Sequence, residues 1–184
     1  RTATHAAVLY SASDIAVLRD ADVANHPYIA RLGVELLDPR TTVADVRAQV
    51  EAPRFARRSL AGLLLDQGFL AGIGNLYADE ILWEARLHPE RSVESLHADE
   101  RERLHTAIQQ VLELAIDRRG TSLSDYVDAA GEQGTNQDHL QVYGRHGMPC
   151  SREACGQEIV RAVVAQRGTW FCPSCQPASV VAPA

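Results

Sequence analysis

Residues 63–83 read LLLDQGFLAGIGNLYADEILW, and this stretch decides the fold. The apolar segment from Arg58 to Gln67 predicts one helix, and the glycine-rich turn at 71–75 ends it. A second helix is predicted from Asn75 to Ala85, because apolar residues recur there at helical intervals. Its expected buried face consists of Leu76, Ile81, Leu82 and Ala85. Two helices joined by a glycine turn therefore form the centre of the predicted fold.

Further helices are expected on both sides of this pair. Residues 41–50 begin with a threonine cap, space valines at helical intervals and stop before Pro53. Residues 98–118 carry the most regular apolar stripe and end before Gly120, which suits the C′ position. The stripe consists of Leu104, Ile108, Val111, Leu112 and Ala115. Glu100 is expected on the solvated face of this helix.

Shorter elements complete the prediction. Residues 4–10 are typical of the end of a strand, 121–127 of a short capped helix and 128–138 of a polar loop. Strands and turns are expected from Leu140, and a disordered tail over 177–184.

All four cysteines lie near the end of the chain, as Cys150-x4-Cys155 followed by Cys172-x2-Cys175. Two close cysteine pairs, separated by enough residues for a hairpin, are typical of a tetrahedral Zn²⁺ site. The expected arms are residues 159–164 and 169–171, with the turn at 165–168. Four buried thiols or two disulfides are the alternatives. We expect one structural Zn²⁺, because so small a ribbon needs a metal to fold.

The glycine turn and Arg167 each allow two interpretations. Gly74 and the start of the second helix present free backbone N–H groups, and Asn75 adds an amide donor, so this end suits a phosphate. The alternative is a structural turn with Asn75 as the N-cap. Arg167 is expected at the tip of the hairpin, where its guanidinium can fork onto a phosphate. The alternative is an ordinary solvated arginine.

The stretch at 63–83 resembles the helix–two-turn–helix of bacterial formamidopyrimidine-DNA glycosylase and endonuclease VIII. The motifs that follow keep the order of that family: GTSLSDYV at 120–127, LQVYGR at 140–145, and QRGTWFC at 166–172 within the four-cysteine ribbon. The resemblance covers nearly the whole chain, residues 1–176.

The resemblance implies a base-excision repair enzyme that removes oxidised bases and cleaves abasic-site DNA by β,δ-elimination. It implies a mainly α fold with a small β zinc ribbon and damaged double-stranded DNA as the partner of a monomer. A cytoplasmic, nucleoid-associated location follows from it. The implied regions are the end of a β-sandwich domain (1–12), a helical DNA-binding domain (13–139), the zinc ribbon (140–176) and a tail (177–184). The expected DNA-binding residues are Asn75, Gly74, Arg145 and Arg167.

Two departures from the family pattern affect these expectations. The family's nucleophile is an N-terminal proline followed by Glu, and a Lys of the same domain contacts DNA; this chain begins with Arg1 and contains no Lys. We therefore expect the chain alone to be catalytically inactive, with no catalytic residue to assign.

The second departure concerns the branch of the family. The motifs QGFLAG at 67–72 and LYSASD at 9–14 resemble endonuclease VIII, whereas YADE at 77–80 and GTSL at 120–123 resemble the other branch. In addition, Ala61 stands where the formamidopyrimidine branch commonly has Lys. The balance leans toward endonuclease VIII and oxidised pyrimidines.

Composition bounds the other possibilities. The net charge is −6, which on bulk charge alone argues against nucleic-acid binding. However, residues 76–132 carry six Arg against thirteen acids, while 145–184 carry four Arg against two Glu, so the acid is segregated from the ribbon. No apolar run approaches the roughly 18 residues of a membrane span. A stand-alone DNA-binding module without catalytic activity and a zinc-ribbon protein-interaction domain remain as alternatives.

Overall fold

The computed structural model describes residues 17–36, 38, 40–123, 127 and 131–178. The chain divides into two compact units, Arg1–Arg31 and Leu32–Ala184. In the first unit the described part holds helix α1 (Asp20–Val23) and a 3-10 turn, η1 (Ile29–Arg31). The predicted strand at 4–10, residues 124–126 of the predicted short helix, and residues 179–184 lie outside the described residues; Leu123 and Val127, which are described, are not helical.

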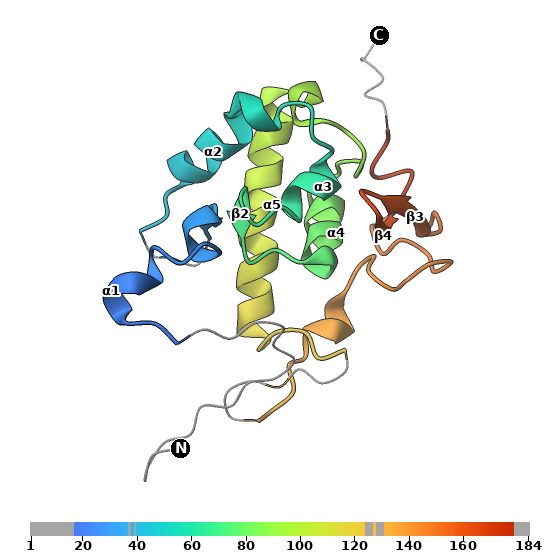
Figure 1. Cartoon of the computed structure of the whole chain (residues 1–184). Helices are drawn as coiled ribbons and strands as arrows, with labels where there is room; N and C mark the ends of the chain where they lie inside the picture. The colour runs from blue at the N-terminus through green and yellow to red at the C-terminus, as the bar shows by residue number, and fades with distance from the viewer. Residues whose placement is uncertain (1–16, 37, 39, 124–126, 128–130, 179–184) are drawn as a thin grey trace. The chain divides into compact units, whose positions relative to one another are not determined.

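The second unit is built around two helices, α4 (Asn75–Glu84) and α5 (Ala98–Asp117), with α3 (Leu60–Leu64) packed against α4 (Figure 1). Helix α2 (Val43–Glu51) contacts α5. Two short parallel strands, β1 (Val34–Glu35) and β2 (Leu70–Ala71), pair with each other. Three 3-10 turns, η2 (Pro53–Phe55), η3 (Val93–Ser95) and η4 (Asn136–His139), complete this unit's connections.

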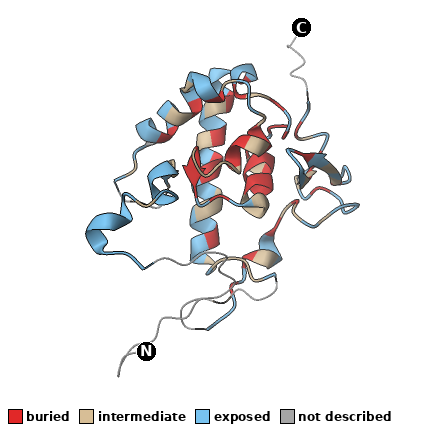
Figure 2. Cartoon of the chain, viewed as in Figure 1, coloured by how far each residue is buried: buried red, intermediate tan, exposed pale blue. Residues whose placement is uncertain are grey.

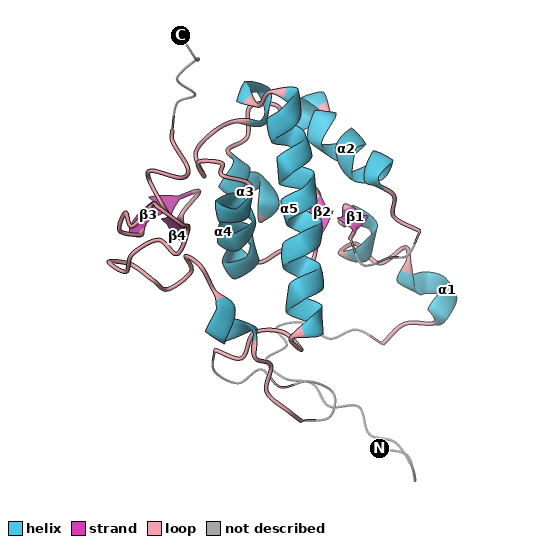
Figure 3. Ribbon diagram, turned by 180° about the vertical axis from the view of Figure 1, so that it is seen from behind, coloured by secondary structure: helices cyan, strands magenta, loops and turns pink. Residues whose placement is uncertain are grey.

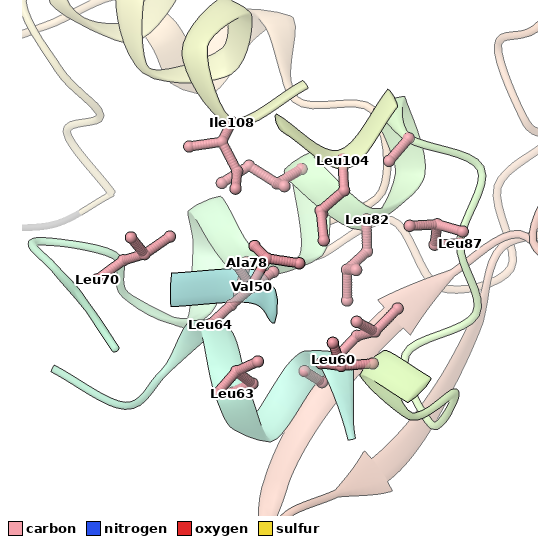
Figure 4. Close-up of a cluster of buried hydrophobic side chains, with 14 of the residues drawn as sticks. Val50, Leu60, Leu63, Leu64, Leu70, Ala78, Leu82, Leu87, Leu104 and Ile108 are labelled. Carbon is pink, nitrogen blue, oxygen red and sulfur yellow. The ribbon is translucent and has the colours of Figure 1, made fainter. Parts of the chain in front are cut away.

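The core lies where α3, α4 and α5 meet, and burial is concentrated on these helices (Figure 2). In Figure 4, Leu104 and Ile108 of α5 project toward Leu82 and Ala78 of α4. The predicted stripe of α5 is confirmed: Leu104, Ile108 and Ala115 are buried, and Val111 and Leu112 pack against the core. These contacts hold α4 rigidly from one side.

Local hydrogen bonds explain where the helices begin and end. Thr42 caps α2 in a capping box with Asp45, as the threonine signal predicts. The helix predicted at 58–67 is shorter than expected, because the Asp66 carboxylate accepts the Gly68 N–H at 2.9 Å and starts a turn. Gln67 then braces the glycine turn: its amide donates to the Ile73 carbonyl, and its oxygen accepts the Gly72 N–H, each at 2.9 Å.

Two expectations about α5 are wrong. Arg119, not Gly120, occupies the C′ position, with φ of 58°, and Gly120 follows at C″ with φ of 83°. The N–H groups of these two residues bond to Ile116 and Ala115, so an arginine bears the left-handed conformation that the sequence assigned to glycine. Glu100 is buried rather than solvated, because both its carboxylate oxygens pair with the Arg91 guanidinium, at 2.6 and 2.7 Å.

The C-terminal part is an antiparallel hairpin of β3 (Val160–Val164) and β4 (Arg167–Phe171), with Val164 opposite Arg167. The turn has two residues, Ala165 and Gln166, both left-handed, rather than the four expected. Both views place the hairpin beside α4 (Figures 1 and 3). Among the described residues, no helix is long and apolar enough to cross a membrane.

Candidate nucleic-acid interface and metal centre

The four cysteines come together at the base of the hairpin, with all four sulfurs within 4.8 Å of one another. The Sγ–Sγ distances include 3.9 Å for Cys150–Cys175, 3.6 Å for Cys155–Cys172 and 3.4 Å for Cys155–Cys175. Sulfurs placed about 2.3 Å from one Zn²⁺ lie about 3.8 Å apart, so the cluster has the size of a Zn²⁺ tetrahedron. None of the four is in a disulfide, which removes that alternative in this structure.

The chemistry of the cluster also suits a cation. Burial raises the pKa of the Cys172 and Cys175 thiols, and the neighbouring sulfurs disfavour several thiolates in so small a space. A bound Zn²⁺ supplies the positive charge that stabilises four thiolates and links the two halves of the ribbon. The four cysteines are therefore able to bind one zinc ion.

Gln176 attaches the cysteine cluster to Leu87, in the segment that follows α4, a role that no sequence motif indicated. This side chain is fully buried; its oxygen accepts the Cys172 N–H at 2.9 Å, and its amide donates to the Leu87 carbonyl at 3.0 Å. A glutamine directly after the last cysteine is the only signal that could have found it.

The structure brings Asn75 and the hairpin tip together. Asn75 is the first residue of α4, and its Nδ2 donates to the Gly168 carbonyl, next to Arg167, at 2.8 Å. Gly74, not Asn75, is the N-cap, and no side chain caps the first turn of α4. Arg167 is exposed, and among the described residues no hydrogen bond or ion pair engages its guanidinium. Uncapped N–H groups, an amide and a cation thus lie on neighbouring parts of two elements.

Neither the backbone conformation nor the packing of the protein requires a glycine at position 74. Its φ of −105° is open to any residue, and a Cβ added there would meet no atom within 4 Å. By contrast, Gly33 is required by packing, because a Cβ would lie 2.2 Å from the Phe69 carbonyl oxygen. The space beside Gly74 lies at the uncapped start of α4, where a ligand can approach the backbone closely.

Arg145, the fourth predicted DNA-binding residue, occupies a different environment. Its side chain is half-buried, and Nη1 donates to the Leu140 carbonyl at 3.3 Å. Burial raises the pKa of Glu80, and the positive charge of Arg145 offsets part of that rise. Among the described residues, no hydrogen bond joins Arg145 to Asn75 or Arg167, so the predicted set is not brought together in full.

Two buried carboxyl groups on α4, those of Asp79 and Glu80, join the helix to the C-terminal part of the chain. Glu80 accepts three consecutive backbone N–H groups, from Gln141, Val142 and Tyr143, at 2.8, 2.9 and 2.9 Å. Asp79 accepts the N–H of Trp170 at 3.1 Å. Burial raises the pKa of both carboxyls, to about 8 for Asp79. Sequence reasoning missed these roles, because an Asp-Glu pair on a helix is normally solvent-facing.

The outer side of the hairpin carries an aromatic stack. The ring of Trp170 lies 4.6 Å from that of Tyr143, and the Arg161 guanidinium lies 5.2 Å above Trp170. Arg161 also lies over Gly168, where a Cβ would approach its Nη2 to 2.7 Å. Tyr143 and Arg161 therefore both contact the side chain of Trp170, the residue whose backbone N–H donates to Asp79.

Both the helical part and the zinc ribbon of this unit match known protein families. Residues 32–127 match the formamidopyrimidine-DNA glycosylase H2TH domain, and residues 147–178 match the zinc finger found in FPG and IleRS. The chain is 48% identical over 139 residues to formamidopyrimidine-DNA glycosylase of Roseiflexus sp., covering 76% of this chain and 50% of that protein. With the enzyme of Herpetosiphon aurantiacus it shares 50% over 148 residues, covering 79% and 52%.

Solved structures agree with these sequence matches. The crystal structure of the MutM (Fpg) protein from Thermus thermophilus has a TM-score of 0.76 at 42% identity, covering 88% of this chain and 60% of that one. The Lactococcus lactis Fpg in complex with an abasic site-containing DNA has a TM-score of 0.74 at 37% identity, covering 86% and 56%. The chain spans about half the length of the curated relatives it matches. It belongs to the formamidopyrimidine-DNA glycosylase family, of which it carries the helix–two-turn–helix domain and the zinc finger.

Proposed function

We propose that this chain is the DNA-gripping part of a base-excision repair glycosylase and abasic-site lyase, and that it binds damaged double-stranded DNA through the phosphates. The observation that carries the proposal is the junction of the uncapped start of α4 with the hairpin tip, where Asn75 meets Gly168 and Arg167 is exposed. N–H groups, an amide and a guanidinium are the donors that position a nucleic-acid backbone without reading its sequence.

The proposed contacts are Asn75, Gly74 and Arg167, with Arg145 in a supporting position beside Glu80. Asn75 is half-buried at the first position of α4, where backbone N–H groups have no partner within the helix, and its Nδ2 donates to the hairpin. Arg167 supplies the only formal charge of these three, so phosphate binding here depends on local donors rather than on net charge. This resolves the apparent conflict with a chain whose net charge is −6.

A salt titration tests the proposal. Fluorescence anisotropy of the zinc-loaded chain is measured on a labelled duplex with one abasic-site analogue, on the undamaged duplex and on the single strand. Each neutralised phosphate contributes about −0.9 to the slope of log K against log salt, so one to three charged contacts predict a slope of about −1 to −3. Tighter binding to the damaged duplex is expected. If the chain binds none of the three nucleic acids at low salt, the proposed function is refuted.

A matched pair of variants assigns the contact to the junction. Arg167→Gln removes the charge at the hairpin, whereas Arg86→Gln removes another exposed charge just beyond the other end of α4. We expect Arg167→Gln to weaken binding about tenfold and to reduce the salt slope by about 1, as one lost phosphate contact should. Equal losses in both variants would show that only general charge matters.

The lyase chemistry is proposed for the family's full-length enzyme, with β,δ-elimination through an N-terminal proline amine. The 184 residues themselves hold no Lys, so no side-chain amine can form a Schiff base with the sugar. We therefore expect no covalent adduct when this chain is incubated with an abasic-site duplex and borohydride. An adduct seen by gel shift and mass spectrometry would contradict that expectation.

Base preference is the finer part of the proposal. The sequence motifs lean toward oxidised pyrimidines, whereas the solved relatives from Lactococcus lactis include complexes with Fapy-dG-containing DNA. Competition between duplexes carrying an oxidised purine or an oxidised pyrimidine, opposite the same base, separates the two preferences. The lean toward pyrimidines requires the pyrimidine duplex to compete better.

A further inference from the structure

The free edge of β4 is held by two side chains that are one turn apart on α4. In an antiparallel pair, alternate residues of each strand direct their N–H and C=O away from the partner strand. Arg167 pairs with Val164 beside the two-residue turn, so the next outward-facing backbone groups belong to Gly168 and Trp170. These are the groups that α4 binds: Asn75 Nδ2 donates to the Gly168 carbonyl at 2.8 Å, and the Trp170 N–H donates to Asp79 Oδ2 at 3.1 Å.

Asp79, the second of these two side chains, lies inside the protein. Asp79 is 2% exposed, and it lies between Ala78 and Glu80, which are also buried. A carboxyl group in such a place is costly unless it is bonded, and burial raises its pKa to about 8. A buried acid that is not among the four metal-binding cysteines requires another explanation, and among the described residues its carboxylate accepts a hydrogen bond from the strand that carries Arg167.

We propose that Asp79 is a positioning residue for DNA binding: by accepting the Trp170 N–H, it holds β4 so that Arg167 and the start of α4 address the same phosphate backbone. This inference rests on the proposed function. Asp79 itself touches no DNA; its effect passes through the strand. Without it, β4 keeps the single Asn75 bond at its edge and pivots there, and Arg167 moves relative to the N–H groups of α4.

A double-mutant cycle on the zinc-loaded chain tests this role, with anisotropy on the abasic-site duplex as the readout. Arg167→Gln alone is expected to weaken binding about tenfold. Asp79→Ala alone should weaken it about fivefold, because the Trp170 N–H loses its acceptor. In the Asp79→Ala background, Arg167→Gln should cost less than about threefold, since the arginine is already misplaced.

Two controls separate positioning from loss of structure. Asp79→Asn keeps an oxygen acceptor of the same shape and should bind within about twofold of the wild type. Ile81→Val loosens the core side of α4 but leaves both bonds to β4 in place, so its effect should be additive with Arg167→Gln. Zinc content and the unfolding midpoint are measured for every variant, and a variant that loses zinc is replaced in the cycle by Asp79→Ser.

The outcomes are distinct for the inference and for the function on which it rests. If the wild type binds no DNA, the proposed function fails. If the wild type binds and Arg167→Gln weakens it, but Asp79→Ala has no effect or an additive one, the positioning role of Asp79 is overturned while DNA binding stands. Non-additivity together with rescue by Asp79→Asn supports the inference.

Discussion

Glu80→Gln is the most informative single change for the joint between the helical domain and the zinc finger. In the wild type, one carboxylate oxygen accepts the N–H groups of Val142 and Tyr143, and the other accepts that of Gln141. A glutamine can present one oxygen to two of these donors. Its NH₂ group then faces the third N–H, so one buried donor loses its acceptor.

The expected cost follows from that count. A buried donor without a partner costs about 1–3 kcal/mol, and the two remaining bonds lose their charge assistance. Against this, the neutral glutamine avoids the desolvation that raises the pKa of Glu80. We therefore expect Glu80→Gln to destabilise the unit by about 2 kcal/mol, a large share of a typical domain's stability.

Urea unfolding followed by tryptophan fluorescence measures this cost, because Trp83 and Trp170 both pack in or against the cluster around the zinc site. A zinc-sensitive dye reports release of the metal in the same titration. Glu113→Gln on the exposed face of α5 is the control and should stay within about 0.5 kcal/mol of the wild type. If Glu80→Gln changes the free energy of unfolding as little as the control does, the three N–H bonds are not what holds the 141–143 segment to α4.

Three further predictions follow from the same contacts. Gly74→Ala should change the unfolding midpoint little, because its Cβ meets no protein atom and the poorer N-cap is offset by the lower entropy of the unfolded chain. It should nevertheless weaken duplex binding several-fold in anisotropy, and unchanged affinity would show that nothing approaches this glycine closely. Cys155→Ala should abolish stoichiometric zinc in elemental analysis and unfold the ribbon, since three thiolates and a small core do not suffice; retained zinc would exclude Cys155 as a ligand. Asp79→Asn should become more stable relative to the wild type as pH rises from about 5 to 8, and the difference should level off above that. The pKa of Asp79 is raised from 3.8 to about 8 in the folded protein, so the unfolded state loses its proton first and the wild type loses stability between these two values. Thermal melts across this range check the sign, and a constant difference would refute it.

The sequence predicted those parts of the fold that depend on local chemistry. The threonine cap of α2, the stripe of α5 and the glycine turn before α4 each follow from patterns of a few neighbouring residues. The four cysteines were equally readable, because metal ligands need residue type and spacing more than context. Predictions failed where a distant partner decides the outcome: Glu100 is buried because Arg91, nine residues earlier, reaches it.

The candidate site divides in the same way. Asn75 and Arg167 were found from motifs, yet the bond from Asn75 to the Gly168 carbonyl spans 93 positions and could not be inferred from spacing. Asp79 and Glu80 lie within the decisive stretch, but no neighbouring residue indicates that α4 is covered on their side, so their burial could not be predicted. Their partners belong to β4 and to the 141–143 segment, which only the folded chain brings alongside.

The arrangement makes α4 the shared reference for both halves of the proposed grip. Asn75, Asp79 and Glu80 lie within six consecutive residues, which span about 7.5 Å along a helix axis. A helix packed by α3 and α5 does not bend over that length, so the strand and the loop that these side chains hold are fixed relative to the uncapped first turn. Zinc gives the ribbon its own shape, but none of its ligands comes from α4, so the ribbon's position on that helix depends on other contacts: the hydrogen bonds of Asn75, Asp79 and Glu80 and the packing of Trp83 against the cysteine cluster. Placement of Arg167 therefore depends on the hydrogen bonds from α4, and loss of zinc and loss of those bonds should weaken DNA binding by separable routes.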